Sequence, residues 1–172
     1  MISKCETIQL KLADQNDIRF ILDIENDSEN SLYIGKWTYS QHREALKNDD
    51  IIYFIIKDSL GNKVGFVIIT ELLNKHNSIH IKRIAISSLY KGKGYGKAAF
   101  ELILNWIFKN TQAHRVWLDV KDFNTRAIHI YKSLGFVIEG MLRDYEFNSL
   151  KNKYESFHIM SILRKEYEIL ER

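Results

Sequence analysis

One stretch of the chain decides the fold: Lys91-Gly92-Lys93-Gly94-Tyr95-Gly96-Lys97. A strand-like run, Ile79 to Ser87, precedes it, and a strongly apolar helical run, Ala98 to Phe108, follows it. Glycines let the backbone turn sharply and approach a ligand closely. Free N–H groups at the start of a helix, together with the helix dipole, favour an anion there. The stretch therefore predicts a phosphate-binding turn, and the alternative is a tight turn with solvated lysines.

The spacing of these glycines excludes the two commonest nucleotide-binding motifs. The dinucleotide fingerprint requires G-x-G-x-x-G, whereas the glycines here follow G-x-G-x-G. The nucleoside-triphosphate loop requires G-x-x-x-x-G-K followed by Ser or Thr. Here Ala98 follows Lys97, and Lys91 stands where the first glycine would be. Binding of ATP or NAD by this loop is therefore kept only as an alternative.

Length and composition set the class of protein. A chain of 172 residues can bury a sizeable core, and we expect a single domain over residues 1–172. The net charge of +3 is too small and too dispersed to predict nucleic-acid binding. One cysteine, Cys5, permits no intrachain disulfide. Residues 1–14 lack the apolar core of a signal peptide, and no run approaches the roughly 18 apolar residues of a membrane span. We therefore predict a cytoplasmic protein that binds neither nucleic acid nor membrane.

The hydrophobic pattern predicts an alternation of strands and helices. Strands are expected at Thr7–Leu12, Ile51–Ile56, Val64–Leu73, Ile79–Ser87, Arg115–Val120, Phe136–Ile138 and Phe157–Leu163. Helices are expected from Ile18, after a capping box of Thr38 and Gln41, from Ala98, after Asn124 or Thr125, and in the tail from Arg164. The strand–helix–strand unit over residues 79–120 favours a parallel pair. We expect an α/β (α+β) fold with a mixed, partly parallel, twisted sheet flanked by helices.

Two motifs together make the chain resemble a known family. Its cofactor loop reads Arg/Gln-x-x-Gly-x-Gly/Ala, which residues 91–96 match except that lysine stands at the first position. Its second signature is similar to Trp117-Leu118-Asp119-Val120-x-x-x-Asn124-x-x-Ala127-x-x-x-Tyr131-x-x-x-Gly135-Phe136. On these residues the chain resembles the GNAT family of N-acetyltransferases. Glu139-Gly140-x-x-Arg143 and Met160 are similar to the branch that holds ribosomal-protein N-terminal and spermidine acetyltransferases.

The resemblance implies a GNAT-like sheet, often splayed at a β-bulge, and acetyl transfer from acetyl-CoA, a cosubstrate, to an amine. It would place the pantetheine arm and the acetyl carbonyl on backbone groups of Ile84, Ala85 and Ile86. It would place the pyrophosphate on the residues Lys91, Gly92, Lys93, Gly94, Tyr95, Gly96 and Lys97. Asn124 would help to hold the cofactor. No metal site is expected, because the histidines and Cys5 show no ligand spacing.

The chemistry of acetyl transfer requires a base and an acid. A primary alkyl amine has a pKa of roughly 10, so it arrives protonated and must lose a proton before it attacks the thioester. The leaving thiolate, with a pKa of about 8.5, benefits from a proton donor. By the resemblance, Tyr131 would be this donor, and Asp119 occupies the position of a carboxylate used as base. Asp119 as a structural residue, or a base at His80, Glu71, Glu25 or a chain of waters, remain open.

The acceptor is not fixed by the sequence. We expect direct attack by a primary amine of a peptide N-terminus or of a small polyamine-like molecule, and aminoglycosides and free amino acids stay open. A polyamine would favour an acidic cleft, which Glu25, Asp27 and Glu29 would supply. The aromatic residues Tyr33, Trp37 and Tyr39 either line that cleft or pack on the core. The alternative function is a CoA-binding module without catalysis, and a homodimer is the default assembly.

Overall fold

The computed structural model describes residues 3–4 and 7–171, and its centre is one eight-stranded sheet in the order β1-β2-β3-β4-β5-β6-β8-β7. The strands are β1 (Ser3–Lys4), β2 (Ile8–Leu12), β3 (Ile52–Asp58), β4 (Lys63–Thr70), β5 (Ser78–Ile86), β6 (Arg115–Lys121), β7 (Val137–Asn148) and β8 (Lys153–Leu163). The α-helices are α1 (Ile18–Asn26), α2 (Tyr39–Ala45), α3 (Tyr95–Asn110), α4 (Thr125–Ser133) and α5 (Arg164–Leu170). Three 3-10 turns are η1 (Gln15–Asp17), η2 (Asn30–Leu32) and η3 (Ser88–Tyr90). Cys5 and the prediction about its disulfide lie outside the described residues.

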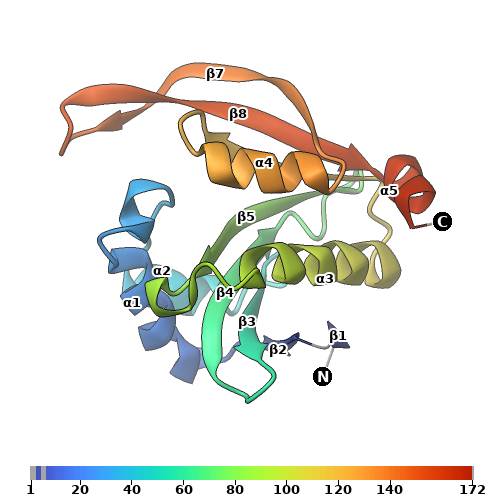
Figure 1. Cartoon of the computed structure of the whole chain (residues 1–172), viewed down its shortest axis with the longest axis horizontal. Coiled ribbons are helices and arrows are strands. Elements are labelled where there is room, and N and C mark those ends of the chain that lie inside the picture. Colours follow the sequence, from blue (N-terminus) through green and yellow to red (C-terminus); the bar gives the residue numbers. More distant parts are fainter. Residues whose placement is uncertain (1–2, 5–6, 172) are drawn as a thin grey trace.

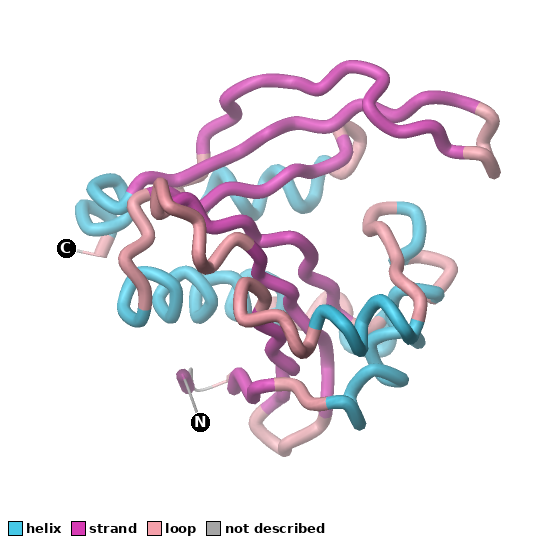
Figure 2. The backbone as a smooth tube through the Cα atoms, turned by 180° about the vertical axis from the view of Figure 1, so that it is seen from behind, coloured by secondary structure: helices cyan, strands magenta, loops and turns pink. Residues whose placement is uncertain are grey.

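Helices cover both faces of the sheet, as Figure 1 and the view from behind in Figure 2 show. On one face α3 buries Phe100 and Ile103 in a core with the strands, and on the other α1 and α2 bury Ile21 and Ala45. Each large apolar side chain that is fully buried, such as Ile or Phe, stabilises the fold by about 1.5–3 kcal/mol. Strands β5 and β6 are parallel, and the other neighbouring strands are antiparallel. The predicted mixed, partly parallel sheet flanked by helices is confirmed.

Local signals start α2 and α4, and end α4, where the sequence predicted, whereas α3 begins at Tyr95, three residues before the predicted Ala98. The Thr38 hydroxyl accepts from the Gln41 N–H at 3.2 Å, and the Gln41 side chain accepts from the Thr38 N–H at 2.8 Å, so the capping box is confirmed. The Asn124 side chain caps α4 by accepting from the Ala127 N–H at 3.3 Å. Gly135 follows α4 with φ at 91°, a conformation that only glycine adopts without strain.

The sheet opens in its middle. Strand β5 pairs with β6 only at Ser78–His80, opposite Arg115–Trp117, and beyond these residues no pairing joins the described parts of the two strands. The register between β4 and β5 also shifts at Ile68 and Ile69, which leaves Lys82 as an extra residue, a β-bulge. In Figure 1, β5 runs away from the layer formed by β7 and β8. The splayed sheet with a bulge, which the resemblance implied, is present.

The C-terminal hairpin is longer than predicted. Phe136–Ile138 was expected as the whole strand, but β7 runs on to Asn148, and β8 begins at Lys153 rather than Phe157. The reason is that β7 is an edge strand whose side chains are almost all exposed, and two register shifts interrupt its pairing. It therefore lacks the alternation of apolar and polar residues that marks a half-buried strand. Strand β4 ends early, at Thr70, because Glu71 adopts a left-handed φ of 63°.

No helix among the described residues combines the length and apolar character that crossing a bilayer requires.

Candidate active site

A cleft of ≈ 1210 Å³ lies where β5 and β6 diverge. Its walls come from the connection between α1 and α2, from β5, from the glycine stretch, from β6, from the start of α4 and from the β7–β8 hairpin. Tyr131, Asp119 and all the predicted cofactor-binding residues line this cleft except Lys93, whose ammonium lies 5.3 Å from the Tyr90 ring centre. Residues from two distant motifs are thus brought to one place.

One edge of β5 presents free backbone groups to this cleft. The Ser87 N–H donates to the Val64 carbonyl on β4 at 2.8 Å. From Ser87 back along β5, the backbone N–H and C=O groups of successive residues point alternately toward β4 and away from it. Alternation turns the N–H and C=O of Ala85 toward β4 and those of Ile84 and Ile86 toward the cleft. The Asn30 side chain donates to the Ile86 carbonyl at 3.1 Å, which agrees with this direction. The Ile86 carbonyl is thus already paired, whereas the Ile84 peptide groups and the Ile86 N–H are placed to bind a ligand in extended form.

The glycine stretch forms the turn that leads into α3. Gly92 and Gly94 have φ of 79° and 78°, and Gly94 is the N-cap of the helix. Nothing lies within 4 Å of a Cβ built on either residue, so the backbone conformation, not lack of space, requires glycine there. The Lys91 ammonium lies 3.2 Å from the Glu29 carboxylate, and Lys97 is exposed at the cleft rim. Helix N–H groups and these lysines provide a positive end to the cleft.

Asp119 lies on β6 at the point where the sheet opens. Its carboxylate accepts from His80 Nε2 at 2.8 Å, and Thr70 Oγ1 lies 3.2 Å from His80 Nδ1. The His80 ring stacks on Trp117 with 3.9 Å between ring centres. Burial alone would raise the pKa of Asp119, but the hydrogen bond and charge of His80, together with the charge of Lys82, hold this pKa below its usual range. Asp119 is therefore ionised at neutral pH.

Tyr131 reaches the same cleft from α4. Its ring packs against Phe100 and Phe136, with 4.8 and 6.1 Å between ring centres. Its hydroxyl makes no hydrogen bond to any described residue. Burial raises the pKa of Tyr131 well above its usual range, and the carboxylate of Asp119 raises it further. Tyr131 thus keeps its proton, and the field of Asp119 reaches it, so the two predicted catalytic residues share one site.

The other candidate bases differ in position. Glu25 is fully buried and does not line the cleft, because its carboxylate binds Arg83, accepts from the Trp37 N–H at 3.2 Å and lies 2.9 Å from His42 Nε2. This buried network of Glu25, Arg83 and His42 was not predicted from the sequence. Glu71 does line the cleft, and the Trp117 indole N–H donates to it at 3.2 Å.

Two of the three aromatic residues near α2 belong to the cleft. Tyr33 and Trp37 line it, and the Arg83 guanidinium lies 5.0 Å from the Trp37 ring centre. Tyr39 does not line it, and its hydroxyl accepts from the Gln15 side chain at 3.4 Å.

The geometry agrees with the comparison of the chain with known proteins. Residues 18–136 match the family model described as the acetyltransferase (GNAT) family. The chain belongs to the GNAT family. It is 28% identical over 167 residues to a spermidine N(1)-acetyltransferase of Vibrio cholerae, covering 93% of this chain and 95% of that one. It is 26% identical over 170 residues to a spermidine N(1)-acetyltransferase of Escherichia coli, covering 94% and 88%.

A solved GNAT structure shares the fold. The spermidine N-acetyltransferase of Vibrio cholerae in complex with CoA and spermine superposes with a TM-score of 0.84 at 24% identity, covering 94% of this chain and 98% of that one. The chain is therefore an N-acetyltransferase that uses acetyl-CoA, as the motifs predicted. In residues 3–4 and 7–171, no group of three or more metal-ligating side chains comes together.

Proposed function

We propose that this GNAT enzyme transfers the acetyl group of acetyl-CoA to a primary amine of a polyamine by direct attack. The observation that carries the proposal is the ionised Asp119 facing the same cleft as the protonated Tyr131. The spermidine acetyltransferases that the chain resembles along most of its length support a polyamine as acceptor.

Residues that face the cleft would bind the two substrates and transfer the protons of the reaction. Peptide groups of Ile84 and Ile86 would hold the pantetheine arm and the acetyl oxygen, while the glycine stretch and Asn124 would hold the rest of the cofactor. Asp119 would bind the ammonium of the acceptor and would take up its proton, directly or through water, as the amine attacks the thioester carbon. Burial would raise the pKa of Asp119, but the hydrogen bond and charge of His80 hold it below its usual range, so the carboxylate stays charged and able to bind the ammonium. Tyr131 would donate to the departing thiolate.

A second carboxylate, Glu71, suits the next ammonium of a polyamine. It lies beside the His80–Trp117 stack, and carboxylates and aromatic faces both attract cations. The acidic residues expected to attract a polyamine are otherwise engaged. Glu25 is paired with Arg83, and Asp27 accepts from the backbone of Glu29 and Asn30, both at 3.0 Å.

The test is release of free thiol from acetyl-CoA in the presence of spermidine, spermine, a linear monoamine, a peptide, an aminoglycoside and single amino acids. We expect the highest kcat/KM with spermidine or spermine. The variant Glu71→Gln should raise KM for spermidine several-fold and leave KM for the monoamine unchanged, whereas Glu44→Gln, an exposed control outside the cleft, should change neither.

Release with peptides alone would replace the polyamine by the peptide N-terminus as acceptor. Binding of acetyl-CoA without release on any amine would favour the CoA-binding module without catalysis. The homodimer, the cytoplasmic location and the absence of nucleic-acid, membrane and metal partners stay predictions.

A further inference from the structure

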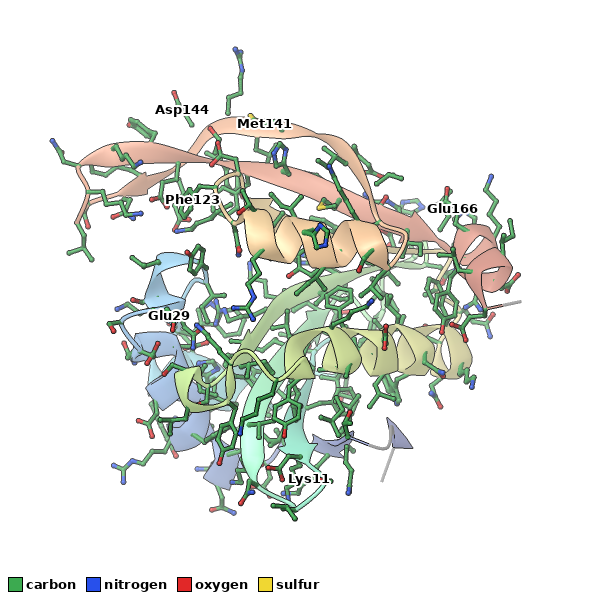
Figure 3. All side chains as sticks on the ribbon, in the orientation of Figure 1. Lys11, Glu29, Phe123, Met141, Asp144 and Glu166 are labelled. Atoms are coloured by element: carbon green, nitrogen blue, oxygen red, sulfur yellow. The ribbon has the colours of Figure 1, made fainter. Side chains whose placement is uncertain are left out.

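An aromatic contact spans the cleft between two arms, the α1–α2 connection and the β6–α4 connection. Tyr33 follows η2 on the connection from α1 to α2, and Phe123 follows β6 on the opposite arm. Their ring centres are 5.9 Å apart with an angle of 44° between the planes. Both residues line the cleft, and each keeps more than a third of its surface exposed. Figure 3 shows Phe123 and Glu29, a neighbour of η2, on opposite sides of the gap between the arms.

The Phe123 side of this contact rests on a charged cluster. The ammonium groups of Lys151 and Lys121 lie 4.7 and 5.8 Å from the Phe123 ring centre, within the range of a cation–π attraction. Both lysines bind the buried Glu155, at 3.1 and 2.6 Å. The cluster joins β6 to β8, so Phe123 is held against the sheet and not carried on a free loop.

The Tyr33 side is fastened to β5. The Tyr33 N–H donates to the Asn30 carbonyl at 2.9 Å, which closes the η2 turn. The Asn30 side chain in turn donates to the Ile86 carbonyl at 3.1 Å. The two rings therefore meet at the ends of two anchored segments, one on β5 and one on β6 and β8.

The Tyr33–Phe123 contact lies at the end of the cleft where β5 and β6 have separated. The other end is the His80–Trp117 stack, where the pairing of β5 and β6 stops. Between the two ends on β6 lies Asp119, two residues from Trp117. From Trp117 to Phe123 an extended chain advances by at most roughly 20 Å, at about 3.3 Å per residue. On the face of the sheet that carries α1 and α2, Asp119 therefore lies in a window of the cleft between the His80–Trp117 stack and the Tyr33–Phe123 contact.

We propose that Tyr33 and Phe123 determine which acceptors the enzyme accepts, by limiting the width of this window. A slender, unbranched amine reaches Asp119 with the rings in contact, whereas a peptide N-terminus or an aminoglycoside ring requires the rings to part. The inference rests on the proposed acetyl transfer to an amine and adds the shape of the acceptor to its charge.

The test compares two linear amines, spermidine and a monoamine of similar length, with two bulky ones, a peptide with a free N-terminus and an aminoglycoside. The variants are Tyr33→Ala, Phe123→Ala, the double variant and the conservative Tyr33→Phe. Tyr39→Ala is the matched control, because it is an exposed aromatic residue a few positions away that does not line the cleft.

We expect the ratio of kcat/KM for bulky to linear amines to rise about tenfold in each alanine variant, the scale on which a hydrophobic contact discriminates between substrates. The double variant should add little to either single one, since both remove the same contact. Tyr33→Phe and Tyr39→Ala should leave the ratio unchanged.

An unchanged ratio in both alanine variants, or an equal rise in Tyr39→Ala, would overturn the inference. Failure of the proposed function is a different result. If the wild type prefers the monoamine to spermidine, the polyamine proposal fails, while the comparison of bulky with linear amines still decides the role of the two rings.

Discussion

Replacing Tyr131 by phenylalanine separates catalysis from stability in this enzyme. The change removes one oxygen and leaves the ring contacts with Phe100 and Phe136 in place. The hydroxyl has no hydrogen-bond partner among the described residues, so the free energy of unfolding should change by no more than about 0.5 kcal/mol. For a chain of this length that corresponds to a shift in Tm of about 2 °C or less.

Turnover should respond far more. A positioned proton donor contributes about 10²- to 10⁴-fold to such a reaction. Because burial and the charge of Asp119 raise the pKa of Tyr131, the phenol is a weak acid, and we expect the lower end, a loss of about 100-fold in kcat. This equals about 2.7 kcal/mol of transition-state stabilisation. The phenol does not titrate between pH 7 and 9, so the loss should be the same throughout that range.

The assay is steady-state thiol release at several pH values, together with the Kd of acetyl-CoA by calorimetry and Tm by thermal unfolding. Tyr167→Phe is the matched control, since this tyrosine stacks on Phe108 at 4.6 Å outside the cleft. A kcat within twofold of the wild type would refute the role of Tyr131 as donor. A fall in Tm of more than 5 °C would show that its hydroxyl has a structural partner.

Further predictions concern stability and cofactor binding. Glu25→Leu should lower the free energy of unfolding in urea by about 3–5 kcal/mol, because a buried guanidinium loses its partner, and a loss below 1 kcal/mol would contradict this. Gly65→Ala should lower Tm and weaken acetyl-CoA binding, since its Cβ would lie 2.4 Å from the Ala85 carbonyl oxygen, whereas Gly140→Ala meets no atom within 4 Å and should change neither. The pKa of Asp119 is lower in the folded state, so its contribution to stability is present above about pH 4 and is lost as the pH falls through the folded value. Asp119→Asn should therefore reduce the difference between urea midpoints at pH 7 and pH 3, and an unchanged difference would refute this linkage.

Local signals in the sequence predicted much of the fold. The capping box of Thr38 and Gln41, the cap at Asn124 and the glycine at position 135 each act within a few residues, so their effect is visible in the chain itself. The parallel pair of β5 and β6 followed from the strand–helix–strand order. The length of β7 could not be predicted in this way, because an exposed edge strand carries no hydrophobic period.

The same distinction between local signals and long-range contacts applies to the candidate active site. The glycine stretch and the segment from Asp119 to Tyr131 are contiguous motifs, and the fold brings them to one cleft. The Glu25–Arg83 pair joins residues 58 positions apart, and nothing local marks a buried ion pair. The contact of Tyr33 with Phe123 depends in the same way on how two distant segments meet.

The opening of the sheet also has a consequence for how the molecule unfolds. In the described residues, backbone pairing joins β5 to β6 only at Ser78–His80, so the sheet consists of two halves with a short hydrogen-bonded seam. Buried side chains of both halves pack in one core cluster, so beyond these pairs the halves are joined by side-chain packing rather than by backbone hydrogen bonds. Acetyl-CoA lying along the free edge of β5 would act as a strand shared by both halves, and its binding energy would be added to the seam. In hydrogen exchange, protection of β6 and β8 amides should then rise with cofactor concentration more than protection of β3 amides, so that the cosubstrate also fastens the two halves into one folding unit.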